Sequence, residues 1–246
     1  MPRQARRKSE SGYYHIILRG IGRQILFEDD EDNERFLSTV QRYRRELGFE
    51  LVAWCLMENH AHLLIRDGHD RLEQIMKKIA GSYAYYFNHK YDRVGHLYQD
   101  RFKSEAVEDD AYLLTVIRYI HNNPEKAGLA KARAYRFSSY GAYLKPSEEV
   151  DNAHALALIG GPEQFARFMS GGKDERCLDV EERRALGDGT AVRIICDTCG
   201  VLSGTELQRW DRKERDEALR QLKQKGLSIR QLERLTGINR GVVQKV

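Results

Sequence analysis

The stretch "CLMENHAHLLI", residues 55–65, places two histidines one residue apart within a run of apolar residues. Apolar residues between polar ends are typical of a buried strand, whose side chains alternate between the two faces of a sheet. His60 and His62 are therefore expected on one face, while Ala61 points to the other. Two neighbouring imidazoles on one face of a buried strand either share a ligand or repel one another.

Histidine is the commonest metal ligand in proteins, and two histidines on one strand face supply two ligands of a divalent metal site. A hard cation such as Mg²⁺ or Mn²⁺ also needs oxygen ligands and open positions for water or phosphate. The alternative is a pair of core histidines whose hydrogen bonds are satisfied within the protein. The pair by itself leaves both interpretations open.

A helix predicted over residues 109–123 favours the metal site. It carries Tyr119 and Asn123 four residues apart, and therefore on one helix face. An asparagine carbonyl can complete the ligand set, and a neighbouring phenol can attack a phosphodiester held by the metal. Tyr119 can equally be one of 13 tyrosines that pack on the sheet. Tyr85 and His89 have the same spacing, so spacing alone does not decide between the two tyrosines.

The remaining pattern predicts the order β-α-β-β-α-β-α. The expected strands are 13–19, 49–57, 60–66 and 96–107, and the expected helices are 31–47, about 70–90 and 109–123. Pro124 is expected to end the last helix, since proline disfavours helical backbone at the residue before it. This order predicts an α+β fold with helices on one face of an antiparallel sheet, a ferredoxin-like arrangement, followed by a small all-α domain.

The C-terminal stretch "GLSIRQLERLTGINRGVVQKV", residues 226–246, is typical of a helix-turn-helix. Ser228 is expected to cap one helix and Gly237 to make the turn. In that geometry the second helix faces the major groove of DNA with Asn239, Arg240, Gln244 and Lys245. A plain three-helix bundle used for packing or dimerisation is the alternative.

Glycine-rich breaks between these regions predict three parts. A nuclease-like domain is expected over 1–145, a helical linker region over 146–205 and a helix-turn-helix domain over 206–246. We expect the first part to fold and act without the others.

Charge indicates a polyanionic partner. The net charge is only +4, but residues 3–8 hold four cations and no acid, and residues 211–246 hold ten Lys/Arg against five Asp/Glu. No run approaches the roughly 18 apolar residues of a membrane span, and four unevenly spaced cysteines do not form a disulfide scaffold. The pair in "CDTCG" (196–200) lacks a second pair for zinc. A cytoplasmic, nucleoid-associated protein is expected.

Four blocks together resemble a known family: "YYHIILRG", "LMENHAHLLI", "GHLYQDRFKS" and "RYIHNNPEKAGL". They are similar to the single-tyrosine HUH transposases, most of all to the REP-associated tyrosine transposases of bacteria. The likeness covers residues 13–144, with the blocks in the family's order. The C-terminal stretch resembles the helix-turn-helix of bacterial replication initiators and repressors.

The resemblance implies specific roles. His60 and His62 would be the HUH metal ligands, Asn123 the third ligand and Tyr119, rather than Tyr85, the nucleophile. Two positions depart from the family. The residue between the histidines is usually bulky and is Ala61 here, and Asp100 stands where a glycine is common; neither change removes a catalytic group.

The implied activity is metal-dependent cleavage and rejoining of single-stranded DNA beside a palindromic hairpin, with Mg²⁺ or Mn²⁺ as cofactor and a 5′-phosphotyrosine intermediate. Arg19, Arg101 and Lys103 flank the expected site and are candidates for phosphate contacts. The chain would act as a monomer or homodimer, with duplex flanks as a further DNA partner. A hairpin-binding regulator without catalysis and a rolling-circle replication initiator are the alternatives.

Overall fold

The computed structural model describes residues 7–145, 147–171, 177–178 and 188–245. The chain divides into two compact units, Met1–Asp179 and Val180–Val246. Within the described residues, no helix is both long and apolar enough to span a membrane.

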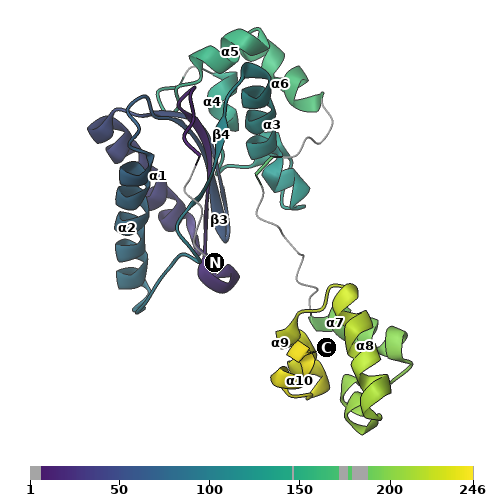
Figure 1. Ribbon diagram of the computed structural model, residues 1–246. Coiled ribbons are helices and arrows are strands. Elements are labelled where there is room, and N and C mark those ends of the chain that lie inside the picture. Colours follow the sequence, from purple (N-terminus) through teal and green to yellow (C-terminus); the bar gives the residue numbers. More distant parts are fainter. Residues whose placement is uncertain (1–6, 146, 172–176, 179–187, 246) are drawn as a thin grey trace. The chain divides into compact units, whose positions relative to one another are not determined.

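The first unit is built on one antiparallel sheet of four strands (Figure 1). The strands are β1 (Tyr13–Arg19), β2 (Glu50–Met57), β3 (His60–Arg66) and β4 (Lys103–Val107), in the spatial order β2-β3-β1-β4. Two residues connect β2 to β3, and this tight hairpin fixes their register, so that Met57 pairs with His60 and Cys55 with His62. The expected α+β class with an antiparallel sheet is confirmed.

Helices cover both faces of this sheet rather than one (Figure 1). The helices α1 (Asp30–Leu47) and α2 (Leu72–Lys90) lie on one side, and α3 (Asp110–Lys126) lies on the other. The reason is visible in β1, where neighbouring residues that point to opposite faces, His15 and Ile16, are both fully buried. A sheet apolar on both faces needs a cover on each.

The helix α3 runs through Pro124 to Lys126, one turn beyond the predicted end. The missing N–H of Pro124 removes a single intrahelical bond, while Ala127 still donates its N–H to the Asn123 carbonyl at 2.9 Å. Asp109 caps the other end, accepting from the Tyr112 N–H at 2.7 Å. The expected end at Asn123 is therefore wrong, and the asparagine lies inside the helix.

Expected strand 96–107 is also shorter than predicted. Only Lys103–Val107 forms β4, while Tyr98 makes a single bridge to Gly20. Three short 3₁₀ turns complete the backbone: Ile21–Arg23, Ala132–Ala134 and Gly204–Arg209.

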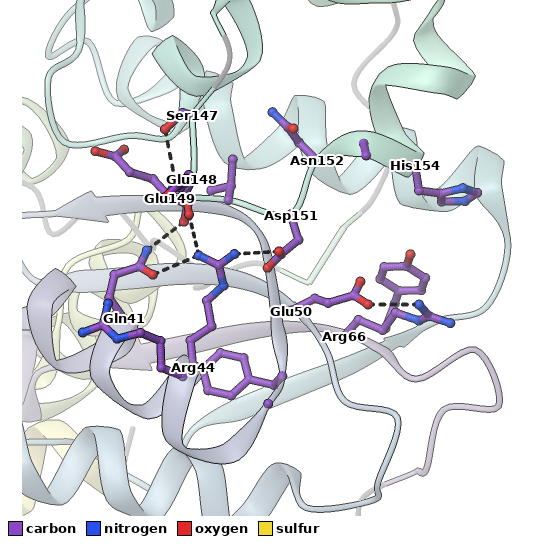
Figure 2. Close-up of a pocket in the computed structure, with 16 residues that line it drawn as sticks. Gln41, Arg44, Glu50, Arg66, Ser147, Glu148, Glu149, Asp151, Asn152 and His154 are labelled. Atoms are coloured by element: carbon purple, nitrogen blue, oxygen red, sulfur yellow. Dashed lines mark hydrogen bonds and ion pairs between the residues drawn. The ribbon is translucent and has the colours of Figure 1, made fainter.

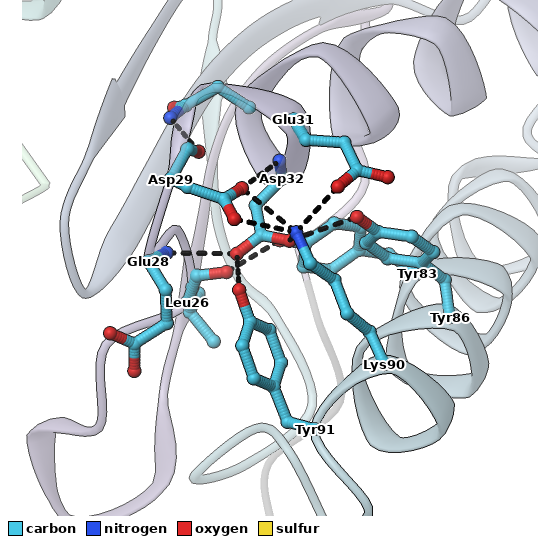
Figure 3. Close-up of polar contacts among 10 residues, drawn as sticks. Leu26, Glu28, Asp29, Glu31, Asp32, Tyr83, Tyr86, Lys90 and Tyr91 are labelled. Atoms are coloured by element: carbon cyan, nitrogen blue, oxygen red, sulfur yellow. Dashed lines mark hydrogen bonds and ion pairs between the residues drawn. The ribbon is translucent and has the colours of Figure 1, made fainter.

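A buried carboxylate joins α1 to the end of α2 (Figure 3). Asp32 is fully buried and accepts from Lys90 Nζ at 2.9 Å, from the Tyr86 hydroxyl at 3.0 Å and from the Tyr91 hydroxyl at 2.7 Å. The Glu28 N–H donates to the same carboxylate at 2.9 Å. Four donors around one buried charge lock the two helices together.

The predicted linker region 146–205 is shared between the two units. Two short helices of this region, α5 (Ala153–Ile159) and α6 (Pro162–Ser170), belong to the first unit. The short helix α4 (Tyr140–Leu144), which precedes the region, belongs to the same unit. Phe165 of α6 is fully buried, with its ring centroid 4.7 Å from that of Tyr143 and 5.7 Å from that of His121. This packing extends the core of the first unit well past residue 145.

The described residues of the second unit contain helices and no strand. It comprises α7 (Asp188–Cys199), α8 (Arg212–Gln224), α9 (Ile229–Thr236) and α10 (Arg240–Lys245) around a small apolar core. A capping box between Ser228 and Gln231 starts α9, and Gly237 ends it with φ 69°, a left-handed conformation that glycine adopts easily. Ile238 and Val243 are buried in the apolar core of this unit.

Candidate metal and tyrosine site

The two histidines of β3 lie on the same face of the sheet as β1 residues of matching register. His62 pairs with Ile17 and His60 with Arg19 across the β1–β3 ladder. Their ring centroids are 5.0 Å apart, and both side chains are buried, at 4% exposure for His60 and 0% for His62. The strand alternation predicted from the sequence is therefore present.

Each histidine uses its Nδ1 atom for a neighbouring side chain. His60 Nδ1 lies 2.7 Å from Asn59 Oδ1, and His62 Nδ1 lies 3.0 Å from His15 Nε2. His62 Nε2 is buried and has no hydrogen-bond partner among the described residues. A buried polar atom without a hydrogen-bond partner costs folding free energy, so a ligand bound at this nitrogen would be stabilising.

Burial keeps these imidazoles neutral. It lowers the pKa of His60 to about 4, helped by the positive charge of Arg19, and lowers the pKa of His15 to about 3. The pKa of His62 lies well below its ordinary value, first through burial and then through the two neighbouring histidines. A neutral imidazole keeps a lone pair on one ring nitrogen, which is the form that binds metals.

Helix α3 places Tyr119 over the same face. Its ring centroid lies 5.6 Å from that of His62 and 5.7 Å from that of His15, with the rings edge to face. Asn123 lies one turn further along and donates from Nδ2 to the Tyr119 carbonyl at 3.0 Å, which leaves its amide oxygen to accept or to ligate. Both side chains are buried, at 7% and 8% exposure.

The residues present fit a divalent cation. The hydrogen bonds of the two neutral histidines involve Nδ1 and therefore do not use Nε2. Together with the buried amide oxygen of Asn123, the two Nε2 atoms form a mixed nitrogen and oxygen donor set. Within the described part of the chain, no third His, Cys, Asp or Glu completes a metal cluster with the pair. Open positions in such a set are the ones that a phosphate oxygen or water can occupy.

The rival tyrosine lies elsewhere. Tyr85 is 76% exposed on α2, and its ring contacts His89 with a centroid distance of 6.4 Å. Neighbouring aromatic residues belong to the core: Tyr83 and Phe87 are buried, and the hydroxyls of Tyr86 and Tyr91 donate to Asp32.

The predicted cationic residues are spread around the end of β1. Arg19 is half-buried beside His60, and Lys103 is exposed on β4 opposite Ile17. Arg101 is exposed, lies 3.8 Å from Glu73 and lines a cleft of about 680 Å³ beside α2. Arg19 and Lys103 share the histidine face by register, whereas the cleft beside Arg101 reaches Leu18 on the opposite face.

A larger cleft of about 1400 Å³ lies at the far end of the sheet and contains no predicted site residue (Figure 2). Its lining includes Arg44, which forms an ion pair with Asp151 at 2.6 Å and donates to the Glu148 carbonyl at 2.7 Å. Arg66, also in its lining, pairs with Glu50 at 3.2 Å. These arginines are engaged in holding the segment 147–154 and strand β2 in place.

In the second unit, the four predicted DNA contacts lie on or next to α10, two at its start and two at its end. Asn239, Arg240, Gln244 and Lys245 are all exposed. Asn239 caps the helix, accepting from the Gly241 N–H at 2.8 Å.

Three residues of the site were missed by the sequence interpretation. His15 and Asn59 hold the two histidines, and Lys126 Nζ lies 4.9 Å from the centroid of the Tyr119 ring. The alternation of β1 was a usable signal for His15, since it places that residue on one face with Arg19. No sequence signal indicated Lys126, because the helix was expected to end before that residue.

The first unit thus combines an antiparallel sheet, a histidine pair on one strand and a helix that carries a tyrosine over that face. A family model described as "Transposase IS200 like" matches residues 8–123. This part of the chain is similar to that family, in agreement with the resemblance of the sequence blocks. No curated protein matches the chain significantly.

One solved structure supports the fold. A REP-associated tyrosine transposase bound to a REP hairpin is 17% identical, with a TM-score of 0.52, and the match covers 73% of this chain and all of that one. A proposed transposase from Deinococcus radiodurans R1 is 19% identical, with a TM-score of 0.35, over 49% of this chain and 97% of that one. At these identities the likeness concerns the fold alone.

Proposed function

We propose that this protein is a metal-dependent DNA strand transferase that cleaves and rejoins single-stranded DNA beside a palindromic hairpin. The observation that carries the proposal is the meeting of Tyr119 with the histidine pair on one buried face, at 5.6 Å between the Tyr119 and His62 rings. The match of residues 8–123 to the family model described as "Transposase IS200 like" supports it.

In this proposal Tyr119 is the nucleophile, and His60, His62 and Asn123 hold the cation. Mg²⁺ or Mn²⁺, when bound, neutralises charge on the phosphodiester and favours the phenolate form of the tyrosine. The tyrosine oxygen attacks phosphorus and forms the new P–O bond, while the bond to the 3′-oxygen breaks and that oxygen takes up a proton. A 5′-phosphotyrosine and a free 3′-OH result. Attack by another 3′-OH reverses the chemistry, so no external energy source is required.

The substrate class follows from chemistry and fold likeness together. The structural neighbour is a REP-associated transposase bound to a REP hairpin, and we carry that substrate class to this chain as part of the proposal. Arg19 and Lys103, on the histidine face, are assigned to backbone phosphates, and Arg101 to the DNA beside it. We assign the exposed residues of α10 to the duplex flank.

The test is covalent capture of DNA. A hairpin oligonucleotide with a labelled 3′ flank and Mn²⁺ should give a protein–DNA adduct that survives denaturing electrophoresis. Tyr119→Phe should abolish the adduct while leaving hairpin affinity within about twofold, because only one hydroxyl is lost. Tyr85→Phe is the matched control and should form the adduct normally. An adduct with Tyr119→Phe, or its loss with Tyr85→Phe, would refute the assignment.

A further inference from the structure

His15 stands beside the proposed metal site without belonging to its ligand set. It is fully buried on β1, and its Nε2 atom lies 3.0 Å from His62 Nδ1. The two rings stack, with centroids 5.3 Å apart and planes at 24°. The opposite ring nitrogen, His15 Nδ1, is buried and has no hydrogen-bond partner among the described residues.

Neighbouring groups do not compete for this histidine. Glu105 of β4 pairs with His15 in register, but its Oε2 atom accepts from the Tyr112 hydroxyl at 2.6 Å and from the Leu178 N–H at 2.9 Å. The Tyr119 ring meets His15 edge to face with its centroid 5.7 Å away. The bond to His62 is therefore the polar contact that orients the His15 ring.

Two neutral imidazoles share one proton in the hydrogen bond between His15 Nε2 and His62 Nδ1, and the ring that carries this proton is the donor. If His15 donates from Nε2, then His62 carries its proton on Nε2 and that nitrogen has no lone pair for a metal. If His62 donates from Nδ1, its Nε2 lone pair is exposed to the site. In the second arrangement a cation satisfies the buried Nε2 atom, and His15 acts only as the acceptor.

We infer that His15 is a positioning residue that accepts a hydrogen bond from His62 Nδ1 and so holds the His62 Nε2 lone pair toward the cation. The inference rests on the proposed function and deepens it, since it assigns a tautomer to the second ligand. Asn59 Oδ1 does the same for His60 at 2.7 Å, so both ligands are oriented through Nδ1. A buried N–H left at His15 Nδ1 is the cost of this arrangement.

The first test is Mn²⁺ affinity of the full chain, read from free Mn²⁺ by electron paramagnetic resonance. His15→Phe removes the acceptor but keeps a planar ring, and should weaken Mn²⁺ binding about 10–100-fold, the usual effect of losing an outer-shell partner. His15→Gln supplies a carbonyl acceptor and should bind about tenfold tighter than His15→Phe. Equal affinities for the wild type and His15→Phe, or for the two variants, would overturn the inference.

The matched control is His121→Phe, the same exchange at another fully buried histidine. His121 bonds Ser139 Oγ at 2.8 Å and packs on Tyr140 and Tyr143, outside the histidine pair. It should leave Mn²⁺ affinity within about twofold, and a loss equal to that of His15→Phe would refute a specific role. If wild type binds no Mn²⁺ and His60→Ala behaves identically, the proposed function itself fails, which is a distinguishable result.

A second measurement needs no variant and stays decisive if His15→Phe does not fold. Two-bond ¹H–¹⁵N spectra of histidine-labelled wild type with Mg²⁺ report which ring nitrogen carries each proton. His62 and His15 should both be protonated on Nδ1. A proton on His15 Nε2 in the Mg²⁺ form would overturn the inference.

Discussion

At the scale of single residues, burial makes His60 and His62 a pair of neutral imidazoles rather than a pair of charges. His60 and His62 are neutral at physiological pH because desolvation lowers both pKa values. Their lone pairs are therefore available without release of a proton, and ring repulsion is avoided. Neutral rings do not repel one another as charges, and this is compatible with the proposed shared ligand.

The ligands should not be equally important. His60→Ala or His62→Ala removes an imidazole that nothing nearby replaces, so adduct formation should fall below detection. Asn123→Ala should be milder, because water can replace a neutral amide oxygen. Cleavage across a Mg²⁺ and Mn²⁺ titration measures the ranking. An equal loss in all three variants at saturating metal would contradict it.

A buried histidine also makes the first unit sensitive to acid. Burial lowers the pKa of His121 to about 3, far below about 6.5 in the unfolded chain. The unfolded state therefore binds the extra proton, so this contribution to stability is complete above about pH 6.5 and is lost as the pH falls toward 3. Between pH 7 and pH 5 it should fall by about 2 kcal/mol.

The measurement is urea unfolding with a chelator, followed through Trp54 in a Trp210→Phe background. The difference in unfolding free energy between this protein and its His121→Phe variant should shrink by about 2 kcal/mol on going from pH 7 to pH 5. A difference that stays constant with pH would show that His121 is protonated in the folded state, or solvated.

Sequence periodicity predicted which side chains share a face, whereas the family resemblance was needed to favour Tyr119 over Tyr85. Alternation in a strand puts His60 and His62 on one face, and helical spacing puts Tyr119 beside Asn123. It missed His15 because the bond to His62 joins residues 47 positions apart. Such a partner depends on strand order, which periodicity does not reveal.

At the scale of elements, three of the four strands were predictable within a residue, whereas the start of β4 and the end of α3 were not. Expected 13–19 and 60–66 match β1 and β3, because strong apolar runs end at polar residues. The end of α3 differed because the local preference against helix before proline is small beside the tertiary packing of a buried turn. Coverage of both sheet faces required knowing that β1 and β3 are central.

The junction of α1 and α2 should be a major source of stability. Asp32→Ala removes the buried acceptor of the Tyr86 and Tyr91 hydroxyls and leaves Lys90 with its exposed partners, Asp29 and Glu31. It should lower the unfolding free energy by about 3 kcal/mol, mainly because two buried hydroxyls lose their acceptor. Asp30→Ala is the control, since Asp30 is exposed and pairs with Arg136 on the surface. It should cost under about 1 kcal/mol.

Urea unfolding of both variants, followed through Trp54 in the Trp210→Phe background, gives the comparison. Similar losses for Asp32→Ala and Asp30→Ala would mean that solvent already reaches the carboxylate of Asp32. Asp32→Asn should fall between them, because an amide oxygen accepts some of the same bonds without the charge.

At the scale of the whole molecule, the first unit needs more chain than sequence texture indicates. Ending the chain at residue 144 removes Phe165 from its contacts with Tyr143 and His121, and removes Asp151 from Arg44 and the Leu51 N–H. Loss of one buried phenylalanine alone costs about 3–5 kcal/mol. The glycines of 160–172 indicated a linker, yet helices between them pack on the core.

A chain ending at residue 178 should therefore cleave a hairpin in a metal-dependent way, whereas a chain ending at residue 144 should unfold at a clearly lower temperature. Thermal unfolding and adduct formation of both truncated chains measure this. Equal stability of the two would show that α5 and α6 contribute little to the first unit. Loss of cleavage in both, with folding intact, would make the second unit part of the catalytic machinery.

The second unit should instead govern binding to duplex DNA. Residues 211–246 carry a basic excess, and α10 exposes Arg240 and Lys245. Removing the unit should weaken binding to duplex flanks and make it less dependent on salt, because fewer phosphate contacts form and fewer counterions are released on binding.

Arg240→Ala in the full chain should reduce the slope of log affinity against log salt by about 1 if that side chain contacts a phosphate. Affinities for duplex and hairpin DNA at several salt concentrations measure both effects. Glu233→Ala, on α9 and outside the proposed contacts, is the control that should leave the slope unchanged. An unchanged duplex affinity after truncation at residue 178 would assign the unit to packing or dimerisation, the role that a plain helical bundle would have.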